Sequence, residues 1–395
     1  MKSNPLKIVT GFIVLALNFT ACNSPATISG TIEDLEKENT KIYLIQPDDL
    51  QHVAASYLGK VIDSAIVNAD GSFEFHNPPT TKEPVLLELA VQPNNKAGNY
   101  LNTDNPNKAN YMPIIWQLDE SIHITANYNE FQQSFDIDQP SEVNKALLAL
   151  RNIKATVYQT YIANRHWNVE EGDELMEKEH AILLYQTSLM EFAERTPHLL
   201  PALVALRWTS PENDYERIPE FLVNQCNTWQ NIHPDHPWVQ QLCKQSEPAS
   251  LPVLIGDEFP NIEFPLVTGD TVKLKDVLGK KLTVIDLWAS WCAPCRIENR
   301  KTLVPLWDKY HDNGLQIVAY ALESNETAWK TATDRDGADR WLQSSDLQGD
   351  DAPFLKQIRV RTIPANFVLD SAGVVIAKNI HGEELIGLVE QSFEE

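Results

Sequence analysis

The residues of this chain best suited to chemistry are two cysteines, Cys292 and Cys295, separated only by Ala293 and Pro294. The chain has 395 residues and five cysteines, so a pair this close together stands out. Such a pair can form a redox disulfide, supply half of a tetrahedral metal site, or pack as inert core. The elements around the pair distinguish these alternatives.

The pair falls where a strand gives way to a helix. Residues 282–288 form an apolar, β-branched run typical of a buried strand, and residues 294–310 have helical periodicity. The unpaired N–H groups and positive dipole end at a helix start stabilise a thiolate. We therefore expect Cys292 to be the nucleophile and to form a mixed disulfide, which Cys295 then resolves.

The two other interpretations of the pair are disfavoured. A zinc site needs further ligands, and residues 251–395 contain no other cysteine and only His311 and His381, neither with partner spacing. Inert cysteines are not expected in an oxidising compartment, where a neighbouring pair does not stay unpaired. We expect neither a metal nor any other cofactor, since the cysteines themselves are the redox group.

Length and composition predict several domains and exclude one class of partner. The chain is 43% hydrophobic and 22% charged, and 395 residues are too many for one ordinary core. Its formal net charge is −23, without basic clusters that could follow a phosphate backbone. Binding to nucleic acid is therefore not expected.

The N-terminus has the features of an export signal. Lys2 and Lys7 precede an apolar run over residues 8–19, which is short for a membrane span. The segment ends at Cys22 and resembles a bacterial lipoprotein lipobox, with Phe19 where leucine is usual. The resemblance implies a signal peptide over 1–21, a lipid on Cys22, and a protein anchored in the cell envelope, periplasm-facing or on the outer membrane. An uncleaved anchor, or a plain signal with an incidental cysteine, is the alternative.

Residues 22–140 are predicted to form an all-β domain. Several runs are rich in β-branched and aromatic residues, and turn signals separate them. An antiparallel sandwich or barrel is expected, and the region weakly resembles an all-β domain of unknown function that precedes redox modules in some bacterial lipoproteins. The expected strands include 41–45, 60–67, 72–75, 84–91 and 121–126.

Residues 141–250 are predicted to form a helical domain. Apolar residues recur at intervals of three and four, and prolines divide the region into five or so helices of modest length. Cys226 and Cys243 are nearly equidistant from the helix break at 232–237. Residues equidistant from the turn of a helical hairpin face each other, so we expect a structural disulfide between them.

Residues 251–395 alternate between strands and helices, which indicates a mainly parallel sheet with helices on both faces. The stretches GDEFPNIEFPLVTGDTVKLKDVLGKKLTVIDLWASWCAPCRIEN and VRTIPANFVLDSAGVVIAKNIHGEEL resemble the opening and closing sequences of the TlpA/ResA-type thioredoxin-like proteins. The resemblance implies an α/β thioredoxin-like domain with an N-terminal hairpin, and disulfide oxidoreductase activity outside the cytoplasm.

The same resemblance implies roles for individual residues. Asp286 matches the buried acid that accepts a proton from the resolving cysteine, and Glu298 matches an acid near the pair; their alternatives are an ordinary strand residue and a solvated carboxylate. Pro364, after Ile363, matches the cis-proline loop that pairs with substrate. Trp291 is expected to shield Cys292 or simply to pack. Arg300 stands where the family usually has proline, which leaves a kink in this helix open.

These observations together predict an extracytoplasmic thiol-disulfide oxidoreductase whose partners are protein thiols and disulfides. Reduction is favoured over oxidation, because Ala293 and Pro294 lack the histidine that some strong oxidants carry between their cysteines. Electrons would come from an unidentified membrane or periplasmic donor. The alternatives are a lipid-anchored peptide- or glycan-binding protein with an accessory redox domain, and a peroxiredoxin-like peroxidase.

Overall fold

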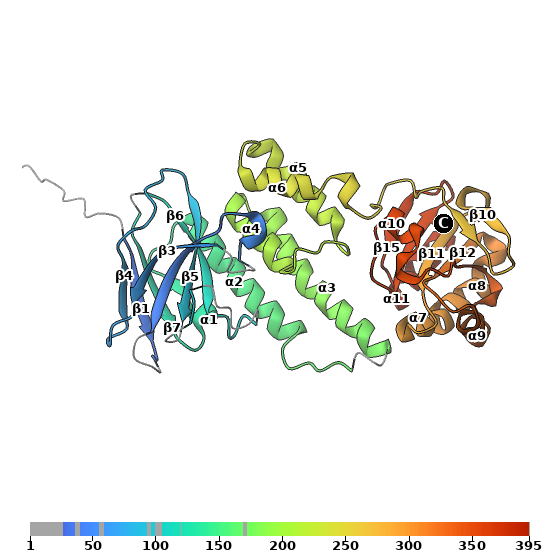
Figure 1. Ribbon diagram of the computed structural model, residues 1–395, viewed down its shortest axis with the longest axis horizontal. Helices are drawn as coiled ribbons and strands as arrows, with labels where there is room; N and C mark the ends of the chain where they lie inside the picture. The colour runs from blue at the N-terminus through green and yellow to red at the C-terminus, as the bar shows by residue number, and fades with distance from the viewer. Residues whose placement is uncertain are drawn as a thin grey trace, which may run out of the picture.

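A computed structural model describes residues 27–35, 40–54, 59–92, 96–98, 105–118, 120–168 and 172–394. The expected signal peptide over 1–21 and Cys22 lie outside these residues. A strand-rich region, a helical region and a mixed region follow one another along the long axis of the molecule (Figure 1). Among the described residues, no helix combines the length and apolarity that crossing a bilayer requires.

In the part of the strand-rich region that the structure describes, two four-stranded sheets share an apolar core. Strand β7 (Ile122–Asn127) alternates buried and exposed residues, whereas β5 (Val85–Gln92) and β6 (Tyr111–Trp116) are almost wholly buried. Helix α2 (Glu142–Tyr161) packs beside β6 and covers it. The first sheet has the order β4-β1-β7-β8 and the second β3-β2-β5-β6. The strands are β1 Ile28–Glu33, β2 Lys41–Gln46, β3 Lys60–Ile66, β4 Ser72–Phe75, β5 Val85–Gln92, β6 Tyr111–Trp116, β7 Ile122–Asn127 and β8 Asp136–Ile137.

This region departs from the expected sandwich in two ways. Strands β1, β6 and the two-residue β8 are additional to the runs named from the sequence, and β1 pairs with β7 in parallel although an antiparallel fold is expected. Pro113 obscures β6 in the sequence, and it is tolerated because β6 lies at a sheet edge. Gly30 similarly weakens the β1 pattern, yet a Cβ there would lie 2.3 Å from the Ile124 carbonyl oxygen.

Among its described residues, the helical region contains five α-helices: α2 Glu142–Tyr161, α3 Gly172–Arg195, α4 Leu199–Thr209, α5 Pro219–Ile232 and α6 Pro237–Gln245. Helices α2 and α3 have 20 and 24 residues, so they are longer than the modest helices expected, because no proline interrupts either. Helix α4 is buried on all sides. Cys226 on α5 and Cys243 on α6 form a disulfide with Cα atoms 4.9 Å apart.

The mixed region has a central sheet of order β13-β12-β11-β14-β15, in which β11 pairs in parallel with β12 and antiparallel with β14. Every residue of β11 is buried. The strands are the hairpin β9 Glu263–Pro265 and β10 Thr271–Lys273, then β11 Leu282–Trp288, β12 Leu315–Ala321, β13 Leu342–Ser344, β14 Ala365–Asp370 and β15 Val375–Lys378. The helices are α7 Ala293–Glu298, α8 Val304–Tyr310, α9 Glu326–Asp336, α10 Pro353–Ile358 and α11 Gly382–Glu394.

The helical region and the mixed region are in contact. Helix α3 runs from the helical bundle towards the mixed region and packs against α7, the helix that follows the cysteine pair (Figure 1). Buried Lys378 on β15 forms a 2.6 Å ion pair with Glu220 on α5. The cysteine pair therefore lies in a domain that another part of the chain holds directly.

Candidate active site

Cys292 and Cys295 are joined in a disulfide at the start of α7. Cys292 is the N-cap residue, and its sulfur accepts a hydrogen bond from the Cys295 N–H at 3.3 Å. The two cysteines are 5% and 3% exposed, whereas Trp291 beside them is 64% exposed. The sulfur of Cys292 therefore occupies the place of a capping oxygen, where the backbone N–H groups of the first turn favour a thiolate.

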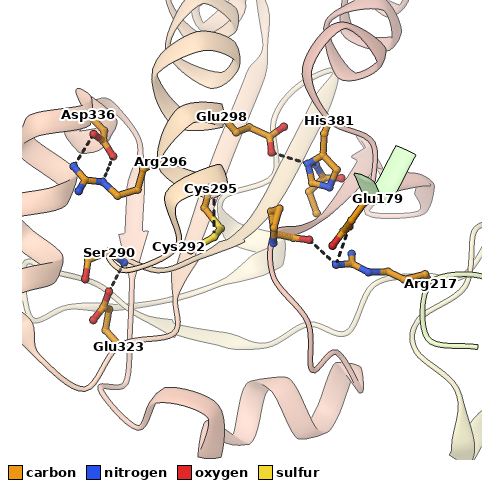
Figure 2. The surroundings of a disulfide bond; sticks show 12 residues. Glu179, Arg217, Ser290, Cys292, Cys295, Arg296, Glu298, Glu323, Asp336 and His381 are labelled. Carbon is orange, nitrogen blue, oxygen red and sulfur yellow. Dashed lines mark hydrogen bonds and ion pairs between the residues drawn. A yellow bond between two sulfur atoms is a disulfide. The ribbon is translucent and has the colours of Figure 1, made fainter. Parts of the chain in front are cut away.

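The loop before the pair is anchored by a buried acid. The carboxylate of Glu323, just after β12, accepts a hydrogen bond from the Ser290 N–H (Figure 2). Glu323 is 3% exposed. Because β11 and β12 are adjacent parallel strands, this bond ties their carboxyl ends together immediately before Cys292.

Asp336 at the end of α9 holds the helix after the pair. Its buried carboxylate accepts hydrogen bonds from Arg296 at 2.7 and 2.8 Å (Figure 2). It accepts a further bond from Arg300 at 2.6 Å. Position 300 is arginine and not the proline that the family resemblance implies, yet the helix is irregular here. Residues Asn299–Leu303 form a π-helical turn. Pro305 accounts for this irregularity, because it has no N–H to donate to the carbonyl of Lys301.

Asp286 lies in the middle of β11, opposite Asn366 of β14. It is 3% exposed, and among the described residues its Oδ2 has no hydrogen-bond partner. Burial raises the pKa of Asp286 well above its ordinary value, and the negative charge of Glu298 raises this pKa further. Once ionised, such a carboxylate is a much stronger base than an exposed aspartate.

Glu298 lies one turn after Cys295, and its carboxylate is not solvated. Its Oε2 is 2.6 Å from Nδ1 of His381, and the two side chains are 7% and 13% exposed (Figure 2). The second oxygen of Glu298 and Nε2 of His381 are buried without partners among the described residues. The contact between Nδ1 of His381 and Oε2 of Glu298 is therefore the one that fixes how these two buried side chains lie.

His381 is one of the site residues that sequence reasoning misses. The sequence shows it only as an isolated histidine without metal-ligand spacing, and no local spacing connects it with Glu298, 83 positions away. Asn366 holds the turn that carries it, since its side-chain amide donates to the Ile380 carbonyl and accepts from the Ile380 N–H. Asn366, which lies opposite Asp286 in the sheet, therefore also holds the turn that carries His381, the partner of Glu298.

The structure also places the predicted proline loop. The Ile363–Pro364 peptide bond is cis, Pro364 is buried and Ile363 is half-buried. The Pro364 carbonyl accepts a hydrogen bond from Arg217, which lies between α4 and α5, and Glu179 of α3 lies beside Arg217 (Figure 2). Two residues of the helical region therefore belong to the surroundings of the disulfide.

Comparisons with known proteins concern the mixed region. The Redoxin family matches residues 254–390. A thiol:disulfide interchange protein DsbE of Pseudomonas fluorescens biotype C is 28% identical over 141 residues, which are 34% of this chain and 71% of the relative. A thiol-disulfide oxidoreductase ResA of Bacillus cereus is 29% identical over 135 residues, 33% of this chain and 71% of the relative. A solved C-terminal domain of a putative thiol-disulfide oxidoreductase from Bacteroides thetaiotaomicron is 30% identical, covers 36% of this chain and 97% of that one, and has a TM-score of 0.34.

The C-terminal part of the chain is therefore a redoxin domain with a thioredoxin-like fold. It is a thiol-disulfide oxidoreductase of the thioredoxin-like type. The fold class and the enzyme class predicted from the sequence are confirmed, together with the strand-rich N-terminal region and the helical middle region.

Proposed function

We propose that this chain reduces disulfides of proteins outside the cytoplasm through the Cys292–Cys295 pair. The observation that carries the proposal is the position of Cys292 as the N-cap of α7 with Cys295 bonded to it in the same turn. This geometry favours the thiolate of one cysteine and puts the other within reach of its sulfur. Exposed Trp291 and the half-buried Ile363 would contact the substrate chain.

The reaction begins from the dithiol. The Cys292 thiolate attacks a substrate disulfide, one substrate sulfur leaves as a thiolate and takes up a proton, and a mixed disulfide remains. Cys295 then loses its proton to ionised Asp286 and attacks the Cys292 sulfur, which expels the second substrate thiolate. The substrate gains two electrons and two protons, and the pair ends as the disulfide seen in this structure.

Three buried groups tune the second step. Asp286 needs a high proton affinity to take a proton from a thiol, and burial together with the Glu298 charge supplies it. His381 holds the Glu298 carboxylate in place by its 2.6 Å hydrogen bond. Asp286 acts on the resolving cysteine, while Glu298 and His381 act through Asp286.

The location and domain plan belong to the same proposal. A signal peptide over 1–21 and a lipid on Cys22 would anchor the all-β domain, 22–140, the helical domain, 141–250, and the thioredoxin-like domain, 251–395, to the cell envelope. An electron donor in the membrane or periplasm would return the pair to the dithiol. Reduction is favoured because Ala293 and Pro294 offer no side chain that stabilises the Cys292 thiolate further.

Replacement of the resolving cysteine tests the proposal. In Cys295→Ser the hydroxyl cannot displace the bound sulfur, so covalent adducts should accumulate on Cys292 and be released by reductant. Mass spectrometry of these adducts would identify the substrates, and Cys292→Ser is the matched control. Trapping by Cys292→Ser alone would reverse the two roles, and trapping of no protein by either variant would refute exchange with protein substrates.

A further inference from the structure

The loop between α4 and α5 of the helical region makes hydrogen bonds to the main chain of the proline loop. Glu216 has a side chain only 7% exposed, and its Oε1 accepts hydrogen bonds from the N–H groups of Arg361 at 2.9 Å and Thr362 at 3.1 Å. Its Oε2 accepts a further bond from the Arg361 guanidinium at 2.8 Å. One buried carboxylate thus binds the backbone of two successive residues just before Ile363.

Arg217 binds the other side of Ile363. One guanidinium nitrogen donates to the Pro364 carbonyl at 2.9 Å, and a second donates to Oδ1 of Asn379 at 2.9 Å. Glu179 of α3 lies 3.7 Å from the same group. The planar guanidinium suits this task, because its donors point in set directions and reach several acceptors at once.

Ile363 itself is left open by these contacts. Among the described residues, its backbone N–H and carbonyl make no hydrogen bond, although its neighbours on both sides are held. A substrate segment that adds to this loop can pair only with backbone groups that are not already used. Within residues 361–364, Ile363 is therefore the residue whose backbone N–H and carbonyl both remain available for pairing.

We propose that Glu216 and Arg217 are positioning residues for protein substrates, which hold residues 361–364 so that the Ile363 backbone is presented to an extended substrate chain. This inference rests on the proposed function and extends its site into the helical region. A loop fixed before binding costs less conformational entropy when the substrate chain pairs with it. A small disulfide does not need this pairing and depends on the contacts less.

The test compares two substrates in variants of the full chain. Reduction of insulin and of a small aromatic disulfide is measured in Arg217→Ala, Arg217→Lys and Glu216→Ala. The ratio of kcat/KM for insulin to that for the small disulfide should fall about fivefold or more in both alanine variants, mainly through KM. Arg217→Lys should recover part of the loss, because an ammonium replaces only one of the two bonds.

Arg340→Ala is the matched control, since it removes an arginine ion pair with Asp308 at 3.2 Å within the redoxin domain. It should leave the substrate ratio unchanged. The proposal is overturned if both alanine variants keep the wild-type ratio, or if they lose activity on both substrates equally. A loss equal to theirs in Arg340→Ala would also overturn it.

Hydrogen exchange separates this inference from the proposed function. The Arg361 and Thr362 amides should exchange faster in Glu216→Ala, whereas Glu216→Gln, which keeps the acceptor oxygen, should preserve their protection. This measurement tests the positioning role even if the wild-type protein reduces neither substrate. That failure would refute the proposed function and not the positioning role. Unchanged protection in Glu216→Ala would refute the positioning role.

Discussion

His381 Nδ1 lies 2.6 Å from Glu298 Oε2, and this contact joins the turn before the last helix to the helix of the cysteine pair. Both side chains are nearly excluded from water. The negative charge of the Glu298 carboxylate, held in this way, raises the pKa of Asp286. The pair thus connects a residue far along the chain with the proton that Cys295 must lose.

Removing the Glu298 charge should change the pH dependence of resolution. In Glu298→Gln the pKa of Asp286 should fall, because one of the two causes that raise it is gone. The midpoint of the pH profile for release of the mixed disulfide should therefore move to lower pH. Stopped-flow measurement of a preformed mixed disulfide gives this profile directly.

The control for that prediction is the exposed residue Glu383 at the start of α11. Glu383→Gln should leave the midpoint unchanged, and His381→Gln should shift it in the same direction as Glu298→Gln by releasing the Glu298 carboxylate. A shift to higher pH in Glu298→Gln would contradict the assigned influence of Glu298 on Asp286.

Asp286→Asn should separate the two chemical steps. The first attack by Cys292 should keep most of its rate, whereas resolution by Cys295 should slow by about 10²-fold or more, as expected for loss of a general base. Rapid-quench trapping of the mixed disulfide measures both steps in one experiment. Equal slowing of both steps would show that Asp286 does not act on Cys295.

Asp286 should also affect stability in a pH-dependent way. The folded state raises the pKa of this acid, so folding favours the neutral form and is opposed once the carboxyl ionises. The stability of the oxidised wild type should therefore fall relative to Asp286→Asn as pH rises from the ordinary aspartate range towards the raised pKa. Denaturant titrations at a series of pH values measure this difference, and a rise with pH would contradict it.

The buried acid Glu88 in β5 leads to a similar prediction of pH-dependent stability for the strand-rich region. Burial raises the pKa of Glu88 from 4.5 to about 8, and the Ala54 N–H and the charge of Arg207 oppose this rise only in part. Protection of β2 and β5 amides from hydrogen exchange should decrease between pH 4.5 and 8 in the wild type, after correction for the intrinsic exchange rate. Glu88→Gln keeps an oxygen for the Ala54 N–H and should abolish this decrease, whereas Glu83→Gln at an exposed position should not.

The Cys226–Cys243 disulfide should stabilise the helical region without affecting redox chemistry. The two residues are 17 positions apart, and closing a loop of about this length contributes roughly 3 kcal/mol. The double variant Cys226→Ala and Cys243→Ala should lower the free energy of unfolding by about that amount and keep its rate of disulfide reduction. Peptide mapping that finds both thiols free in protein from its native compartment would refute the bond.

The local features of this protein can be read from its residue types alone. Cys292 at a strand-to-helix junction, the buried strand that carries Asp286, and the helix break between Cys226 and Cys243 are all recorded in residue types a few positions apart. Periodicity, helix starts and turn signals act over that range, which is why the α/β pattern and the redox character of the pair were predictable. The thioredoxin-like fold and the enzyme class were implied by the family resemblance. Strands β1 and β6 were missed because Gly30 and Pro113 oppose strand structure locally and are accepted only for tertiary reasons.

The packing of distant segments sets which groups meet at the cysteine pair. Glu298 could be read equally well as a solvated carboxylate until His381 was placed against it. Arg217 precedes Pro364 by 147 positions, and Asp336 follows Arg296 by 40. Such contacts leave no trace in local patterning, because burial and charge at one position depend on whichever chain segment packs over it. The proton affinity of Asp286 and the position of the proline loop therefore depend on packing between distant segments. Residue spacing does not predict this packing.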